Sequence, residues 1–180
     1  MNASEIRSLI VSALKGQTLA EERVYSPRDR PTTSPDYPVL LVQTPYDEKQ
    51  SMGRNAPQFT TVTTIRISGR VEEFDGESLD GATRAEAALE NLREQIDKSV
   101  INSYELTRNI QQFKNIRSAI DVSAAGEGHT GQLTYEIDAE YFQGPDDFYP
   151  ITPTPIDEMV ITVGMPDGTT EPVVVIPLKE

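Results

Sequence analysis

Residues 132–142, QLTYEIDAEYF, decide the fold, because apolar and polar side chains alternate strictly along them. One parity carries three acids in succession, Glu136, Asp138 and Glu140. The other parity is apolar or small (Leu133, Tyr135, Ile137, Ala139 and Tyr141). A period of two residues is that of a β-strand, so we expect one face in a core and an acidic stripe on the solvent face.

Two amphipathic helices are predicted. Residues 4–15 repeat apolar side chains at helical spacing (Ile6, Leu9, Ile10, Ala13 and Leu14), with Ser4 or Asn2 as the N-cap and Gly16 after the end. Residues 81–99 follow Asp80, the expected N-cap, and have a second apolar face (Ala85, Ala88, Leu89, Leu92 and Ile96). The small side chains on that face would allow the helix to lie close to a sheet.

Further strands are expected at 38–43, 59–71 and 116–124, with a brief strand at Val24 and Tyr25. The ranges 116–124 and 132–142 would form a hairpin with its tip at 125–131. The ranges 38–43 and 59–71 would form another, whose tip at 44–58 shows no periodicity and is predicted to be a long projecting loop. The range 101–113 fits either a short helix or a strand.

The character of the chain changes after residue 143. Residues 144–157, GPDDFYPITPTPID, contain four prolines and are expected to form an extended linker. Residues 158–180 contain two apolar runs around an Asp-Gly turn signal and are expected to be a β-hairpin too short to be stable alone. We therefore predict an α+β fold: a core domain at 1–143 with a mixed or antiparallel sheet of hairpins packed against two helices, then the linker and a hairpin arm.

The charge of the chain is strongly negative and unevenly spread. The net charge of the 180 residues is −13, and residues 118–180 carry only Lys179 against 12 acids. This balance argues against a protein that grips nucleic acid, since phosphate binding needs clustered Lys and Arg. The chain has no cysteine, which excludes disulfides, thiolate catalysis and Cys-ligated zinc. No stretch resembles a signal peptide or a membrane span, so a cytoplasmic product, or one released by lysis, is expected.

No catalytic or cofactor motif fits its required context. Residues 126–131, GEGHTG, match a dinucleotide-binding glycine loop in letters, but a strand and not a helix follows them. Residues 75–86 span an EF-hand loop but place Leu79 and Asp80 where a ligand and a glycine belong. The single histidine, His129, is expected to be exposed in the tip at 125–131. The sequence therefore predicts no enzyme, no cofactor and no metal.

The segment AEERVYSPRDRPTTSPDYPVLLVQTPYDEK, followed by FTTVTTIRISGRV and an Ala-rich helix, resembles the tail terminator (tail completion) proteins of long-tailed bacteriophages. The matching positions are Arg23, Val24, Tyr25, Arg28, Pro31, Pro38 and residues 40–45. The resemblance covers roughly residues 4–143 and leaves 144–180 without a counterpart in the small members.

The resemblance implies a structural virion protein of the tail or neck, made in the host cytoplasm. It would close into a hexameric ring, cap the tail tube, stop tube polymerisation and join the tail to the head connector. The implied partners are other copies of the chain, the tail tube protein and the head–tail connector protein, with no membrane contact. DNA would pass through the ring without specific binding.

The candidate residues follow from this arrangement. Glu136, Asp138 and Glu140 would line the DNA lumen. A contact loop to the tube or to a neighbouring subunit would contain Tyr46, Asp47, Glu48, Lys49, Met52 and Arg54. Contacts between subunits would involve Arg28, Arg30, Val173 and Val175. Two alternatives stay open: another tail or neck component, such as a tube or head–tail joining protein, and a metal-dependent hydrolase that uses the acidic strand.

Overall fold

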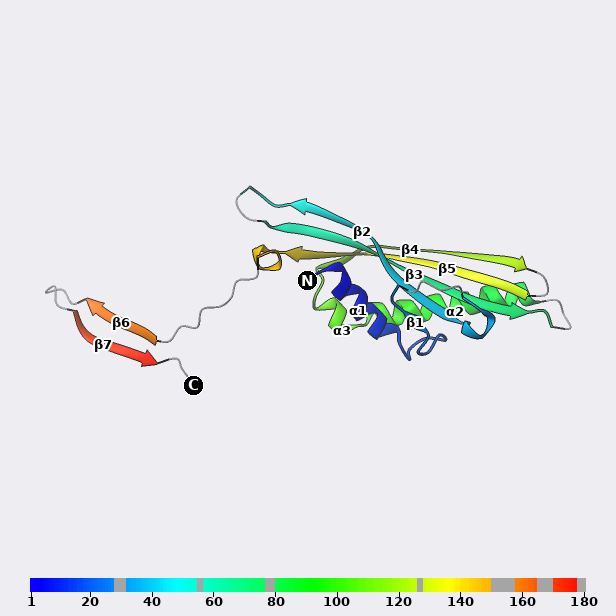
Figure 1. Ribbon diagram of the computed structural model, residues 1–180, viewed down its shortest axis with the longest axis horizontal. Helices are drawn as coiled ribbons and strands as arrows, with labels where there is room; N and C mark the ends of the chain where they lie inside the picture. Colours follow the sequence, from blue (N-terminus) through cyan, green and yellow to red (C-terminus); the bar gives the residue numbers. More distant parts are fainter. Residues whose placement is uncertain are drawn as a thin grey trace. The chain divides into compact units, whose positions relative to one another are not determined.

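The computed structural model describes residues 1–27, 32–54, 57–76, 80–125, 128–149, 158–164 and 170–177. The chain divides into two units, Met1–Phe148 and Tyr149–Glu180. The first unit is an α+β body in which a five-stranded sheet of order β1-β2-β3-β5-β4 carries all three helices on one face (Figure 1). The predicted fold class is confirmed.

The helices and strands follow one another in a simple order. The first unit contains α1 (Ala3–Leu14), β1 (Val24–Tyr25), β2 (Val39–Ser51), β3 (Phe59–Phe74), α2 (Gly81–Ile101), α3 (Tyr104–Thr107), β4 (Gln112–Ala125) and β5 (Gly128–Gln143), with 3-10 turns at Ser34–Asp36 and Pro145–Asp147. Only the β1–β2 pair is parallel; β2–β3, β3–β5 and β4–β5 are antiparallel. The second unit is an antiparallel hairpin of β6 (Glu158–Gly164) and β7 (Thr170–Pro177), as predicted.

The core lies between the helices and the apolar parity of the sheet. The side chains of Ile6, Ile10 and Leu14 on α1 are buried against it, together with those of Leu89, Leu92, Ile96 and Val100 on α2. On β5 the apolar parity found in the sequence is buried (Leu133, Tyr135, Ile137, Ala139 and Tyr141). The prediction for this strand is therefore confirmed.

Two glycines in the strands allow α2 to approach the sheet closely. A Cβ atom at Gly69 of β3 would lie 2.8 Å from Leu92 Cδ2, and one at Gly131 of β5 would lie 2.6 Å from Leu89 Cδ1. Carbon atoms in contact prefer separations of about 3.5–4.0 Å, so no side chain fits at these positions without displacing the leucines. Helix α2 therefore lies close to the sheet because these two strand positions have no side chain, and because some residues on its own apolar face are small.

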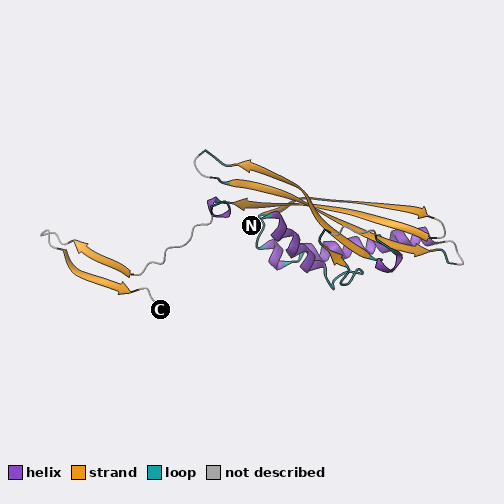
Figure 2. Ribbon diagram, viewed as in Figure 1, coloured by secondary structure: helices purple, strands orange, loops and turns teal. Residues whose placement is uncertain are grey.

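The expectation of a long loop at 44–58 is wrong. Strand β2 continues through residues 44–51 and stays paired with β3 as far as the partners Ser51 and Phe59, with a register shift between Gln43 and Tyr46. Cross-strand hydrogen bonds hold this segment extended although its sequence has no period. Figure 2 shows the outer half of the β2–β3 hairpin extending past the helices.

The residues that cap the starts of α1 and α2 are not all those expected from the sequence. Asn2, and not Ser4, caps α1, and its side chain and Glu5 form a reciprocal capping box. Asp80 occupies the N-cap position of α2 but its side chain makes no capping bond. Asp75 replaces it, because Oδ1 of Asp75 accepts a hydrogen bond from the Gly81 backbone N–H at 2.9 Å.

The structure describes the ambiguous range 101–113 and, apart from residues 126–127, the predicted turn at 125–131. The first contains the single helical turn α3, capped by Ser103, and the start of β4. In the second, β5 already begins at Gly128, so the predicted tip was too long. Residues 145–147 form a 3-10 turn within the first unit, and the Phe148 ring packs edge-on against Phe59 with centroids 5.4 Å apart. Most of the predicted linker, 150–157, lies outside the described residues.

Candidate functional site: the open face and the two ends of the sheet

The acidic stripe of β5 lies on the face of the sheet that the helices leave open, with β3 on one side and β4 on the other (Figure 1). The register places Glu136 opposite both Arg66 of β3 and Arg117 of β4. It places Asp138 opposite Thr64 and Asn115. The chemistry of the stripe is therefore set by two neighbouring strands as well as by its own sequence.

Each carboxylate of the stripe is bound by a cross-strand partner. Glu136 accepts from Nε of Arg66 at 2.8 Å and from Nε of Arg117 at 2.7 Å. Asp138 accepts from Nη1 of Arg117 at 2.9 Å and from the Thr64 hydroxyl at 2.7 Å.

The third carboxylate, that of Glu140, completes a ladder of charges that crosses the three strands. It accepts from the Gln112 amide at 2.9 Å and lies 3.8 Å from Nζ of Lys114. We call Arg66, Lys114, Arg117, Glu136, Asp138 and Glu140 the charge ladder.

The ladder is balanced in charge, and its cations are outermost. The three carboxylate side chains are only 16–17% exposed, whereas the side chains of Arg66, Arg117 and Lys114 are 43–55% exposed. Hydrogen bonds from Arg66, and then from Arg117, hold the pKa of Glu136 below its ordinary value. The acidic stripe therefore lies on the open face as predicted, but three cations of the neighbouring strands, which the sequence pattern did not predict, neutralise it.

The same contacts bear on metal chemistry at the stripe. A magnesium ion is usually bound through one or two carboxylates together with water, but the ladder carboxylates already accept hydrogen bonds from arginine, threonine and glutamine, and Glu140 also lies beside Lys114. Across the described part of the chain, no three His, Cys, Asp or Glu side chains are grouped so that they could hold a metal ion. No helix among those residues is long and apolar enough to cross a bilayer.

His129 is not the exposed tip residue that the sequence predicts. Its side chain is 17% exposed, and its Nε2 lies 3.1 Å from Oδ1 of Asp75, the atom that also accepts from Gly81. The bond from the Gly81 N–H, and then that from His129, lowers the pKa of Asp75. This contact joins the start of α2 to the β4–β5 hairpin and is structural.

Among the described residues, the sheet has two free edges. Strand β1 pairs with β2 only at Leu40 and Leu41, so the longer outer part of β2 has one unpaired side among the described strands. Strand β4 pairs with β5 and, within the same part of the chain, with no other strand. An unpaired edge presents backbone N–H and C=O groups to a further strand.

The outer end of the β2–β3 hairpin carries most of the predicted contact loop. Tyr46 and Met52 are 63% and 60% exposed, and Arg54 is exposed. Asp47 accepts a bond from Thr63, and Lys49 donates to Gln143, so these two side chains are partly committed within the subunit. We call residues 52–54 the hairpin tip.

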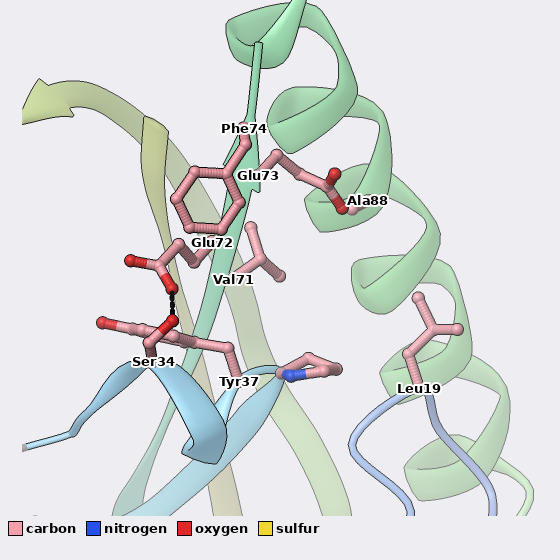
Figure 3. A pocket seen from close by; sticks show the side chains of 9 residues that line it. Leu19, Ser34, Tyr37, Val71, Glu72, Glu73, Phe74 and Ala88 are labelled. Carbon is pink, nitrogen blue, oxygen red and sulfur yellow. Dashed lines mark hydrogen bonds between the residues drawn. The ribbon is translucent and has the colours of Figure 1, made fainter. Parts of the chain in front are cut away.

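A cleft lies at the opposite end of β3. Strand β2 begins at Val39, opposite Arg70, so the last four residues of β3 pair only with β5 within the described chain. Beside them opens a cleft of about 390 Å³, which we call the edge cleft, lined by Leu19, Ser34, Tyr37, Pro38, Val71, Glu72, Glu73, Phe74 and Ala88. Figure 3 shows Leu19 and Ala88 on the helix side, with Phe74, Glu72 and Tyr37 across from them.

The remaining predicted contact residues are less informative. Arg28 and Arg30 lie outside the described residues, as does the side chain of Val173. Val175 is 52% exposed on β7. Arg66, Lys114 and Arg117 were not predicted as site residues. The first and third lie in predicted strands, but only the register sets them against the acids. No protein-family model matches the chain, and no curated protein matches it significantly.

Proposed function

We propose that this chain is a structural virion subunit that closes into a ring at the end of a phage tail tube. It would stop tube polymerisation and join the tail to the head connector. The proposal combines the resemblance of residues 4–143 with one structural observation: within the described part of the chain, the sheet has two free edges and is covered on one face.

The directions of the strands make the two edges compatible. Strands β2, β3, β5 and β4 are adjacent in that order and alternate in direction. Strand β4 of one copy, placed against β2 of the next, would therefore continue the antiparallel order. Such a contact joins two different surfaces, and a heterologous contact repeated from copy to copy forms a ring when the rotation between copies closes, as the proposal requires.

The balanced ladder suits the wall of a channel through which DNA passes. A surface that binds the phosphate backbone needs a net positive charge, and the ladder has three charges of each sign. In this proposal Glu136, Asp138 and Glu140 are lumen residues that neutralise Arg66, Arg117 and Lys114. The tube and the connector would meet the two ends of the ring, with the outer β2–β3 hairpin at one of them.

A pair of proline variants in β4 tests the edge contact. Alternate residues of an antiparallel strand direct their backbone N–H groups to opposite sides. Of the neighbours Ser118 and Ala119, one therefore bonds to β5 and the other faces the free edge. We expect one of Ser118→Pro and Ala119→Pro to destabilise the subunit, and the other to fold normally but not assemble.

Native mass spectrometry of the purified chain gives the readout. We expect a discrete hexamer for the wild type and a folded monomer for the edge-facing proline variant. A hexamer that survives in both variants, provided that each is folded by circular dichroism, would refute the proposed junction. A wild type that is monomeric both alone and with tail tubes would refute the ring.

A second candidate function is that of a tube subunit, and one observation favours it. The hairpin tip and the edge cleft lie at opposite ends of β3, so rings of this chain have different ends that could stack. Rings that grow into long tubes without a partner protein would support this candidate over the terminator.

A further inference from the structure

The edge cleft combines an apolar lining with two carboxylates. Its floor is apolar (Leu19, Pro38, Val71 and Ala88), and the ring of Phe74, which is 55% exposed, forms one wall (Figure 3). Glu72 and Glu73 stand at the rim. Glu73 is paired with Arg84 at 2.9 Å, whereas Glu72 accepts a bond from Ser34 and meets no cation among the described residues.

The hairpin tip carries the complementary groups. Met52 is a flexible, unbranched apolar side chain and is 60% exposed. Arg54 is exposed and forms no ion pair within the residues that the structure describes. A guanidinium can bind a carboxylate and lie over an aromatic ring at the same time, and Glu72 and Phe74 offer both.

The tip cannot reach the cleft of its own subunit. Strand β3 runs from Phe59 at the tip to Val71 at the cleft, which is about 40 Å at ~3.3 Å per residue. Pairing of β2 with β3 as far as Ser51 and Phe59 holds the hairpin extended. A contact between these two sites must therefore join two copies.

We propose that the hairpin tip of one copy occupies the edge cleft of a second copy. Met52 enters the apolar floor, and Arg54 lies between the Glu72 carboxylate and the Phe74 ring. The C-terminal hairpin is the other apolar candidate for the cleft, but the residues of β6 and β7 carry only two charges, Glu158 and Glu171, and both are negative. The acidic rim repels that hairpin and attracts the tip.

The contact does not rest on the proposed function, because it operates between any two copies. If the sheet edges are used within a ring, the tip and the cleft lie at opposite ends of the ring, and the contact joins one ring to the next. In an assembled tail, the tube or the connector would cover one of these ends.

Cross-linking tests the contact directly, since the chain has no cysteine of its own. Full-length Met52→Cys and Ala88→Cys proteins are mixed, one of them isotope-labelled, and treated with a short bis-maleimide. We expect mixed dimers joined between positions 52 and 88, identified by mass. Tyr104→Cys, at a side chain that is 70% exposed on α3, replaces Met52→Cys as the control and should give only background.

If Arg54 and Glu72 attract each other, exchanging their charges should preserve the contact, whereas changing one charge alone should weaken it. Arg54→Glu in the Met52→Cys protein should lower the yield of mixed dimer by roughly tenfold, and high salt should lower it as well. Glu72→Arg in the Ala88→Cys protein should also lower the yield when the Met52→Cys protein keeps Arg54. The yield should recover when the Met52→Cys protein carries Arg54→Glu. Arg93→Glu makes the same charge change on α2 at a residue that does not line the edge cleft, and should leave the yield unchanged.

Two results would overturn the contact. One is a yield of mixed dimer from Met52→Cys that is no higher than the yield from Tyr104→Cys. The other is a Val175→Cys protein that cross-links to position 88 better than Met52→Cys does. Native mass spectrometry of Arg54→Glu separates this contact from the ring. An intact ring without ring-to-ring cross-links supports the contact. A wild type that never forms a ring would refute the proposed function, and the cross-link would still decide the contact.

Discussion

Gly131→Ala probes how closely α2 lies on the sheet. Gly131 of β5 is paired with Val71 and Val122 and lies beneath Leu89 of α2, whose side chain is fully buried. A Cβ atom there would be 2.6 Å from Leu89 Cδ1 and 3.0 Å from Val71 Cγ2. Because contacting carbons prefer about 3.5–4.0 Å, Leu89 must move by about 1 Å.

The free-energy change has two opposing parts. Overpacking a close-packed core costs ~1–3 kcal/mol. Alanine also restricts the unfolded chain more than glycine does, which favours folding by ~0.4–1 kcal/mol. Gly131 has no positive φ, so backbone strain does not add to the cost. We expect a net loss of ~0.5–2 kcal/mol, seen as a fall of roughly 0.3–1 M in the urea midpoint by circular dichroism.

Gly53→Ala is the matched control, because a Cβ atom at Gly53 meets nothing within 4 Å. It should leave the midpoint nearly unchanged. Leu89→Ala supplies the second test. That change alone costs ~2–5 kcal/mol, and in its background the methyl group of Gly131→Ala finds space, so its own cost should vanish. A Gly131→Ala midpoint equal to the wild type, or the same loss in both backgrounds, would refute the reasoning.

Three further predictions concern the charge ladder and two buried contacts. Glu136→Gln, Asp138→Asn and Glu140→Gln together leave three unbalanced cations on the open face, so we expect salt-sensitive binding of duplex DNA, measured by fluorescence anisotropy, where the wild type shows none. Asp75→Asn should flatten the fall of the melting temperature in acid. The pKa of Asp75 is lowered from 3.8, so its contribution to stability is present above that pH and is lost as the pH falls through the folded-state value. Tyr135→Phe removes the bond that the phenol donates to Asp97 and should cost ~0.5–1.5 kcal/mol in urea unfolding. Burial, and then the bond to Asp97, raises the pKa of Tyr135, so the stability tied to its neutral form is complete below pH 10.0 and is lost at higher pH only in the wild type.

Each of these predictions has an outcome that would contradict it. For the ladder, the control is the same loss of three charges from α2 by Glu86→Gln, Glu90→Gln and Glu94→Gln; equal DNA binding by both triple variants would show that total charge, and not the open face, is responsible. An acid slope in Asp75→Asn as steep as that of the wild type would remove the assigned role of Asp75. Equal urea midpoints for Tyr135→Phe and the wild type would show that the bond to Asp97 contributes nothing.

Local periodicity was sufficient for the elements that bury one regular face. Alternation in 132–142 predicted β5 and its buried parity, and the spacing of Ile6, Ile10 and Leu14 predicted α1. These patterns are readable because backbone geometry fixes which side chains of one strand or helix share a face. The Asp-Gly signal likewise located the hairpin of β6 and β7.

The tertiary structure decided what lies opposite what. Residues 44–51 form part of strand β2 because β3 pairs with them. Asp75, and not the adjacent Asp80, accepts the hydrogen bond from the first residue of α2. The sequence determined an acidic stripe on β5, but the register set Arg66 and Arg117 against Glu136 and so made the charge ladder balanced. Spacing along one strand follows from its own backbone, whereas register and strand order depend on long-range pairing, and cross-strand neighbours follow from those.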